Sequence, residues 1–181
     1  MDEATERRIK EECIGILREQ GCPENVIRHC IAVADLAVEI AKNYDDVDEE
    51  VVLRGALLHD IGRSKTHGIA HGIVGGEIAR SLGLDEKIVK IIERHVGAGI
   101  TADEAKRLGL PNTDLVPRTV EEKIVACADN LINGDRRISI EESLAEMRAK
   151  LGDDHPAIER AKKLYDEVLG ASSSESHVKG E

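Results

Sequence analysis

The sequence predicts an all-α protein, and three observations support this. Apolar residues recur at the spacing of an amphipathic helix over nearly the whole chain, and no segment alternates convincingly as a half-buried strand would. Ser, Thr and Asp stand where helices would begin. The 181 residues contain no Phe or Trp and only two Tyr, so Ile, Val, Leu and Ala must form the core. We expect a single domain over residues 1–170.

Nine helices are predicted from the apolar faces and the flanking residues. Gly21 follows the first and Pro23 opens the second, Asp48 and Asp85 suit N-caps, and Pro156 suits a first helical turn. Ser/Thr-x-x-Glu capping boxes stand at Thr101 and Glu104, Thr119 and Glu122, and Ser139 and Glu142. The predicted helices cover residues 4–20, 23–43, 48–60, 71–82, 85–96, 102–109, 119–133, 139–151 and 156–169.

Three stretches interrupt the helical pattern. Residues 61–70 read as a Gly-containing polar loop, and residues 110–118 read as a connector because Pro111 and Pro117 lie in it. Residues 171–181 are Ser-rich and polar, and we expect them to form a disordered tail that includes His177.

Composition excludes several classes of function. The formal net charge of −11 argues against binding a nucleic-acid duplex, and the lack of Phe and Trp removes the usual platforms for stacking bases. The apolar runs are too short to cross a bilayer and the chain opens on charged residues, so we expect a cytoplasmic protein without a membrane partner. A small phosphorylated substrate, drawn in by a local cationic centre, remains compatible with this charge.

The four cysteines show no paired zinc spacing, and each lies among apolar residues. This pattern predicts buried free thiols rather than disulfides or redox chemistry. The residues are Cys13, Cys22, Cys30 and Cys127.

The pair His59-Asp60 closes a segment that is apolar enough to be buried. Packing does not explain an imidazole and a carboxylate side by side at such a place. The two groups are a neutral nitrogen ligand and a hard oxygen ligand, and together they suit one metal ion. The pair therefore predicts a metal site, provided that other segments supply further ligands.

Four further ionisable residues, His29, His71, His95 and Asp129, interrupt apolar helix faces. Taken singly, a His on such a face is more often a satisfied core residue than a ligand. Asp129 is different, because a buried carboxylate is costly without a cationic partner and its own face offers no Lys or Arg within one turn. Together with His59 and Asp60 these four residues make six inward-facing groups on five helices, which favours a shared metal site.

The order of these residues resembles the HD-domain superfamily of metal-dependent phosphohydrolases. The likeness is close in Ala56-Leu-Leu-His-Asp-Ile-Gly62 and in Lys123-Ile-Val-Ala-Cys-Ala-Asp-Asn130, and it covers roughly residues 22–135. It implies an HD-domain helical bundle to which N- and C-terminal helices have been added. The first metal site would consist of His29, His59, Asp60 and Asp129, while His71 and His95 would serve a second ion with Asp60 bridging.

The resemblance also implies a chemistry and a set of substrate contacts. One or two divalent transition ions (Fe, Mn, Co, Ni or Zn) would activate a hydroxide for attack on phosphorus. Asp60 and Arg63 are the expected catalytic residues; Arg63 stands where many relatives carry Lys, and it cannot donate a proton at neutral pH. Arg63, Lys65, His67 and Arg136 are the expected substrate contacts, although solvated positions remain the alternative for His67 and Arg136.

The function predicted on this basis is hydrolysis of a small nucleotide-like or cyclic phosphate ester or anhydride. Two small members of the superfamily are similar in layout, namely the symmetrical diadenosine tetraphosphate hydrolase and the cyclic phosphodiesterase that acts on dihydroneopterin 2′,3′-cyclic phosphate. Two alternatives stay open: a nucleotide-binding sensor without turnover, and an interaction module whose His and Asp are structural. The added C-terminal helices leave a homo-oligomer interface or a lid as open roles.

Overall fold

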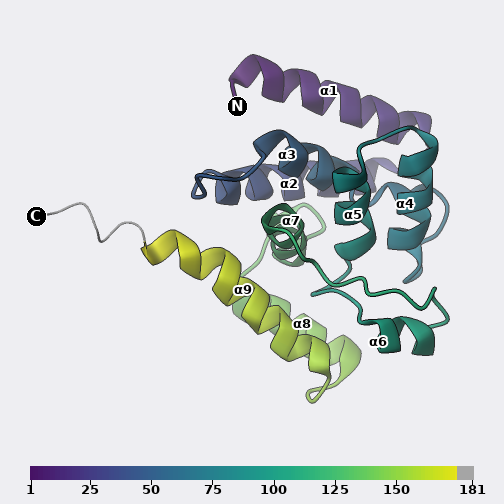
Figure 1. The fold of residues 1–181 in the computed structure, drawn as a ribbon, viewed down its shortest axis with the longest axis vertical. Coiled ribbons are helices and arrows are strands. Elements are labelled where there is room, and N and C mark those ends of the chain that lie inside the picture. Colours follow the sequence, from purple (N-terminus) through teal and green to yellow (C-terminus); the bar gives the residue numbers. More distant parts are fainter. Residues whose placement is uncertain (175–181) are drawn as a thin grey trace, which may run out of the picture.

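The computed structural model describes residues 1–174 and confirms the all-α class (Figure 1). Its elements are α1 Glu3–Glu19, α2 Glu24–Ala41, α3 Glu49–Leu58, the short 3-10 helix η1 Ile61–Ser64, α4 His71–Ser81, α5 Glu86–Arg94, α6 Ala102–Arg107, α7 Val120–Asn130, strands β1 Ile132–Asn133 and β2 Arg136–Arg137, α8 Ile140–Leu151 and α9 Pro156–Ser174. All nine predicted helices are present, with ends that differ by a few residues.

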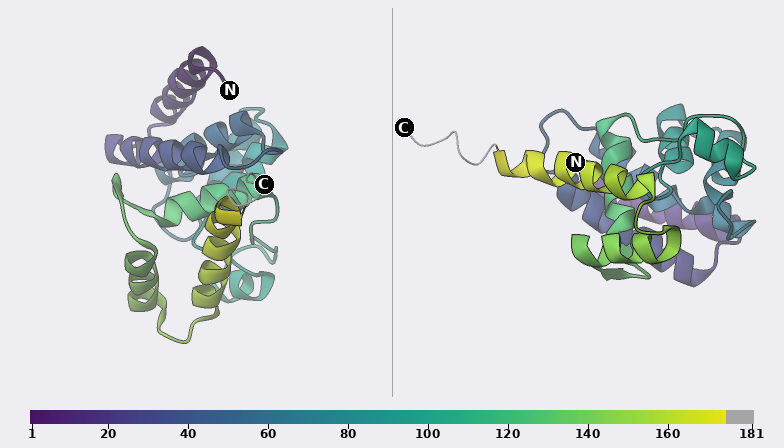
Figure 2. Two further views of the ribbon diagram at one scale, coloured as in Figure 1. Left: turned by 90° about the vertical axis from the view of Figure 1, so that its left-hand side faces the viewer. Right: turned by 90° about the horizontal axis from the view of Figure 1, so that it is seen from below.

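The helices form a central bundle with additions at opposite ends. Helix α3 packs against α2, α5 and α7, and α4 packs against α5 and η1. Helix α1 covers α3 on one side, whereas α9 packs on α7 and α8 packs on α9 at the other end (Figures 1 and 2). The core is aliphatic, as expected, and Tyr165 is the one large aromatic side chain within it.

Most predicted caps are present, and one is wrong in part. The side chains of Asp48 and Asp85 accept backbone N–H groups, and the boxes at Thr101 and Ser139 close in both directions. Thr119 does cap α7, but Glu122 does not complete the box. Its buried carboxylate instead accepts the backbone N–H of Arg118, one residue before the cap, at 2.7 Å, and Arg94 Nη1 lies 3.0 Å from both of its oxygens in a charge-assisted contact.

Helix α7 ends at Asn130, although the sequence pattern predicted a helix as far as residue 133. Residues 132–133 instead pair with residues 136–137 as a minimal antiparallel hairpin. The turn contains Gly134 at φ +64°, a conformation that glycine adopts without steric cost. Asn-Gly is a strong hairpin signal, so this correction was available in the sequence.

The loop and the tail also differ from expectation. Residues 61–64 form a 3-10 turn whose first two residues are buried, so the segment 61–70 is not wholly a polar loop. Helix α9 continues to Ser174, past the start of the predicted tail at residue 171. The remainder of that tail, with His177, lies outside the described residues.

The four cysteines are free and buried, as predicted. Burial raises the pKa of the Cys13 thiol to about 11 and that of Cys127 to about 12, which keeps both protonated at neutral pH. No helix within residues 1–174 combines the length and apolarity that crossing a membrane requires.

Gly62 places η1 against α4, and we predict that Gly62→Ala destabilises the protein. A Cβ at this position would lie 1.9 Å from the carbonyl oxygen of His71 and 2.7 Å from the nitrogen of Gly75, so the backbone would have to move. Urea denaturation should show a loss of about 2–3 kcal/mol. Gly15→Ala in α1 is the matched control, because its Cβ meets nothing within 4 Å; it should stabilise by about 0.5–1 kcal/mol. Equal stability changes in the two variants would contradict the tight packing at Gly62.

Candidate metal centre

The His-Asp pair lies at the junction between α3 and η1. His59 is the C-cap of α3 and is fully buried, and Asp60 begins the turn into η1 with only 4% exposed. The apolar face of α3, which includes Val52 and Ala56, carries the pair into the bundle. Two ionisable side chains, which are costly to bury, therefore lie together at the end of a buried helix.

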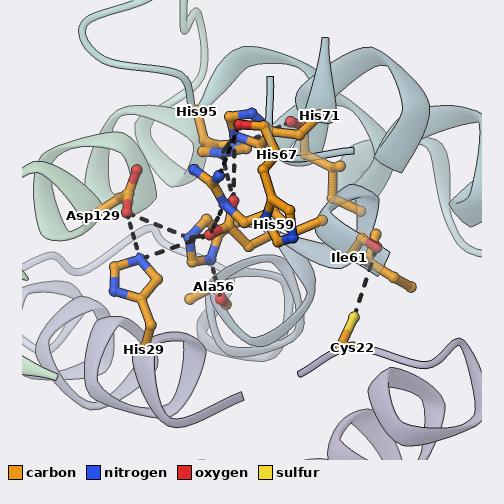
Figure 3. A network of polar contacts seen from close by, with 12 residues as sticks. Cys22, His29, Ala56, His59, Ile61, His67, His71, His95 and Asp129 are labelled. Carbon is orange, nitrogen blue, oxygen red and sulfur yellow. Dashed lines mark hydrogen bonds and ion pairs between the residues drawn. The ribbon is translucent and has the colours of Figure 1, made fainter. Parts of the chain in front are cut away.

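Helices on either side of this pair bring four more of the predicted ligands to it (Figure 3). His29 from α2 places Nε2 2.9 Å from Oδ1 of Asp129 on α7, and His59 Nε2 lies 3.4 Å from the same oxygen. On the other side, Asp60 Oδ1 lies 3.2 Å from His71 Nε2 and 3.4 Å from His95 Nε2. All six predicted ligands thus meet in one place.

Asp60 connects the two halves of this cluster. While Oδ1 faces His71 and His95, Oδ2 lies 3.8 Å from His59 Nε2 and 4.0 Å from His29 Nε2. Two overlapping groups of donors could each hold an ion. One group is His29, His59 and Asp129, and the other is His59, Asp60 and His95. Within each group the ligand atoms lie within 4.8 Å of one another. The carboxylate of Asp60 therefore stands where a bridging ligand would.

All four imidazoles are oriented by the same device: each Nδ1 donates to a backbone carbonyl. The acceptors for His59, His95, His71 and His29 are the carbonyl oxygens of Ala56, Ile92, Gly68 and Gly134, at 2.7, 2.7, 2.9 and 2.6 Å. Because Nδ1 holds the proton, a neutral ring presents its Nε2 lone pair to the cluster. A hydrogen bond from the other ring nitrogen to a carbonyl group is typical of metal-binding histidines.

The arrangement requires a cation. Nε2 of His71 and Nε2 of His95 are 3.0 Å apart, and two lone pairs at that distance repel unless a proton or a metal ion lies between them. His59 Nε2 and Asp60 Oδ1 are also buried without any hydrogen-bond partner. Orphaned buried polar atoms are costly, and a metal ion would satisfy all of them. The donor set therefore fits a divalent metal with nitrogen and oxygen ligands.

The electrostatics of the cluster agree with this requirement. Burial alone would raise the pKa of Asp60 and Asp129, but the charge of His59 and contacts with the other imidazoles hold both pKa values below the ordinary range. Burial lowers the pKa of His95. Burial would also lower that of His59, yet Cys30, Asp60 and Asp129 raise the pKa of His59 well above its usual value. The carboxylates are ionised and need positive charge beside them.

Two cavities reach this cluster from different sides. The larger, of about 680 Å³, reaches His71 and Asp129, and the smaller, of about 340 Å³, reaches His29 and Asp60. Arg63 and His67 line both cavities, so they stand at the boundary between them. Arg63 also donates from Nε to Oδ2 of Asp60 at 2.6 Å. The cluster thus opens into two compartments that Arg63 and His67 separate.

Two of the expected substrate contacts lie elsewhere. Lys65 is exposed and lines neither of these cavities. Arg136 is exposed on β2, where Nη2 lies 3.8 Å from Glu142, and it lines neither cavity. Their roles in substrate binding stay predictions without support from position.

The sequence reasoning missed several residues around the cluster. Gly134 holds His29 through its carbonyl oxygen, and the Asn-Gly turn signal could have located it. Arg107, Lys150 and Arg160 line the larger cavity. They come from helices whose apolar periodicity carries no sign of a ligand site.

Comparison with known proteins matches residues 26–134 to the HD domain. The chain belongs to the HD domain family. It is 53% identical over 163 residues to an uncharacterised protein of Methanocaldococcus jannaschii. The aligned stretch covers 87% of this chain and 95% of that protein. It is 45% identical over 159 residues to a tRNA (cytidine(56)-2′-O)-methyltransferase of Picrophilus torridus. That alignment covers 88% of this chain but 46% of the methyltransferase.

Other relatives are more distant. Ribonuclease Y of Acidothermus cellulolyticus is 31% identical over 147 residues, 78% of this chain and 26% of that protein, so the chain spans less than half of this relative and of the methyltransferase. The HD domain of the L. monocytogenes phosphodiesterase PgpH, solved also with cyclic-di-AMP, superposes with a TM-score of 0.50 at 16% identity over 86% of this chain and 95% of that domain. At this identity the likeness establishes the shared fold.

Metal binding should weaken as the pH falls. The bound ion must displace protons from the imidazoles, and His59 holds its proton the more firmly because its pKa is raised. We expect the Kd for Mn²⁺ to rise at least about tenfold between about pH 8 and about pH 6. Calorimetric titrations in two buffers of different ionisation enthalpy would also count the released protons. An affinity that does not change with pH would argue against imidazole ligands.

Proposed function

We propose that this protein is a divalent-metal-dependent phosphodiesterase that acts on nucleotide-like substrates. The observation that carries the proposal is the convergence of four imidazole Nε2 atoms and two carboxylates at a point where two cavities meet. A phosphodiester has two substituents on its phosphorus, and a compartment on each side of the cluster accommodates both. A phosphomonoester would need only one of them.

In this proposal His29, His59, Asp60 and Asp129 would hold one ion, and His71 and His95 would hold a second together with Asp60. Such ions would lower the pKa of water and polarise phosphoryl oxygens. The protein's own contribution is to keep each imidazole in the tautomer that presents Nε2, through the carbonyl acceptors. It also keeps the ligands in a largely buried pocket, where electrostatic interactions are strong.

Arg63 is proposed to bind the phosphate of the substrate. Its side chain is 30% exposed, lines both cavities and contacts Asp60. A guanidinium in this position can donate two hydrogen bonds to phosphoryl oxygens and offset their charge. It cannot protonate the leaving group. That role falls to His67, whose imidazole borders the same two cavities.

The relatives support phosphodiester chemistry in general terms. The structural neighbour is named a phosphodiesterase and was solved with cyclic-di-AMP, and the ribonuclease Y relatives are named for cleavage of RNA. Single-stranded RNA or a dinucleotide is therefore a candidate substrate. Methyl transfer is not proposed for this chain, which aligns with less than half of the methyltransferase.

A nucleotide-binding sensor without turnover is the second candidate. The contact of 2.6 Å between Arg63 Nε and Asp60 Oδ2 favours it, because this ion pair occupies the oxygen that a metal ion would share with His29 and His59. If Arg63 kept that position in the metal-loaded protein, it would weaken the first metal site. Turnover measurements distinguish the two candidates.

Replacement of Asp60 or Asp129 by Asn should abolish metal-dependent hydrolysis. We expect kcat/KM for bis-p-nitrophenyl phosphate, with Mn²⁺ added, to fall at least about a hundredfold in each variant, with loss of bound metal by elemental analysis. Asp45→Asn, at an exposed turn, is the matched control and should retain both. Full turnover by the Asp60 and Asp129 variants, with intact circular dichroism, would refute the proposed site.

His67→Ala should reveal the leaving-group acid. A nucleoside alkoxide needs a proton to depart, whereas p-nitrophenolate does not. We expect kcat for a dinucleoside monophosphate to fall about a hundredfold and kcat for bis-p-nitrophenyl phosphate to fall far less. The ratio of the two losses is the measurement. Equal losses with both substrates would remove the acid role from His67.

A further inference from the structure

The larger cavity extends well beyond the metal ligands. Its far walls come from α6, α8 and α9, and we call the part lined by Arg107, Leu108, Met147, Lys150, Leu151 and Arg160 the outer chamber. Helices α8 and α9 lie after residue 134, beyond the stretch that matches the HD domain. In Figures 1 and 2, α6 and the turn between α8 and α9 lie at the same end of the molecule. The chamber is therefore built largely by the added C-terminal segment.

The rim of this cavity is apolar and exposed to solvent. Ile69, Leu108 and Leu151 are 43%, 50% and 47% exposed and all line the cavity. They account for half of the six exposed large hydrophobic residues in residues 1–170. Exposed apolar groups that gather at one opening mark a binding surface, whereas scattered ones do not. Their position favours a ligand with a flat apolar part.

More cationic than anionic side chains line this cavity: Arg63, Arg107, Lys150 and Arg160 against Glu104, Asp129 and Glu146. Arg160 on α9 donates to the carbonyl oxygen of Gly99 at 3.1 Å and to Glu104 at 2.7 Å, while its buried Nε has no partner. Arg107 on α6 and Lys150 on α8 are exposed and form no ion pair with any other residue in the described part of the chain. In a protein with a net charge of −11, a cavity whose lining has more cations than carboxylates favours an anionic ligand.

We propose that the outer chamber binds one nucleotide of the substrate. The base and sugar lie against the apolar lining, and a second phosphate group, one nucleotide away from the reacting one, lies between Arg107 and Lys150. This inference rests on the proposed function, because it requires the reacting phosphate to lie at the metal ligands. The substrate class is thus a phosphodiester with a phosphorylated nucleoside as one substituent, such as a dinucleotide or the end of an RNA strand.

The volumes agree with this assignment. A cavity of about 680 Å³ falls within the range of about 300–1,000 Å³ that is typical of small-molecule sites, and both apolar and charged side chains line it. The smaller cavity of about 340 Å³ takes the other substituent of the phosphorus. A phosphate held by Arg107 and Lys150 would also supply the counter-charge that these two side chains lack in the protein itself.

The test is calorimetric binding of adenosine 3′,5′-bisphosphate and AMP to the Mn²⁺-loaded protein. The wild type should bind the bisphosphate at least about tenfold more tightly, because only it reaches both phosphate positions. Arg107→Glu with Lys150→Glu should remove this preference. Lys87→Glu with Lys106→Glu, which alters the net charge equally at exposed sites outside the cavity, should keep it. Equal affinities of the wild type for the two ligands would overturn the proposal.

The apolar contribution has its own test. AMP should bind more tightly than ribose 5-phosphate, which lacks the base, and Leu108→Ser with Leu151→Ser should reduce that difference by at least about fivefold. Both leucines are about half exposed, so the variant retains its core. If the baseless sugar phosphate binds as well as AMP to the wild type, no base occupies the chamber and the proposal fails.

These outcomes remain separate from the fate of the proposed function. Binding of the bisphosphate with the expected preference, without hydrolysis of any diester, would support nucleotide binding in the outer chamber and refute the proposed enzymatic function. Hydrolysis of bis-p-nitrophenyl phosphate, without preference for the bisphosphate, would support the enzymatic function and refute nucleotide binding in the outer chamber.

Discussion

Four imidazoles and two ionised carboxylates face one another where two cavities meet, and this concentration of hydrogen-bond acceptors governs the structure around it. The pocket holds together only if positive charge is shared among Asp60, Asp129 and the four rings. Protonated His59, whose pKa is raised well above its usual value, and the Arg63 guanidinium beside Asp60 contribute that charge, and bound metal ions would add to it. Most local features of the fold serve to keep these groups at one point.

The ends of helices provide the means. The last carbonyl groups of a helix lack intrahelical donors, and His59 and His95, at the C-caps of α3 and α5, each donate Nδ1–H to the carbonyl three residues earlier. His71 repeats the same three-residue contact at the start of α4. This hydrogen bond thus satisfies a backbone carbonyl group and also selects the imidazole tautomer. The close approach of Gly62 to α4 then fixes the distance between the two halves of the cluster.

Features of the fold and of the site were predictable from the sequence where they depend on residues that are close together along the chain. Apolar periodicity and capping residues are local, and they located all nine helices and the six His and Asp residues of the cluster. Interactions between distant segments were not predictable in the same way: Glu122 also pairs with Arg94, which lies 28 residues away, and it accepts the N–H of Arg118 rather than that of Thr119. The short hairpin after α7 was missed although Asn133-Gly134 announced it. The cavity walls from α6, α8 and α9 depend on how helices pack, and amphipathic spacing says nothing of that.

The separation of the metal ligands from the outer walls of the larger cavity has an evolutionary consequence. Every residue of the His-Asp cluster lies between positions 29 and 129, whereas Lys150, Leu151 and Arg160 belong to helices that follow. Mutations that remodel the C-terminal helices can therefore accumulate without altering the hydrogen bonds that orient the imidazoles. Gene duplication followed by drift in that segment would let one ancestral reaction centre diversify into paralogues with different ligand preferences.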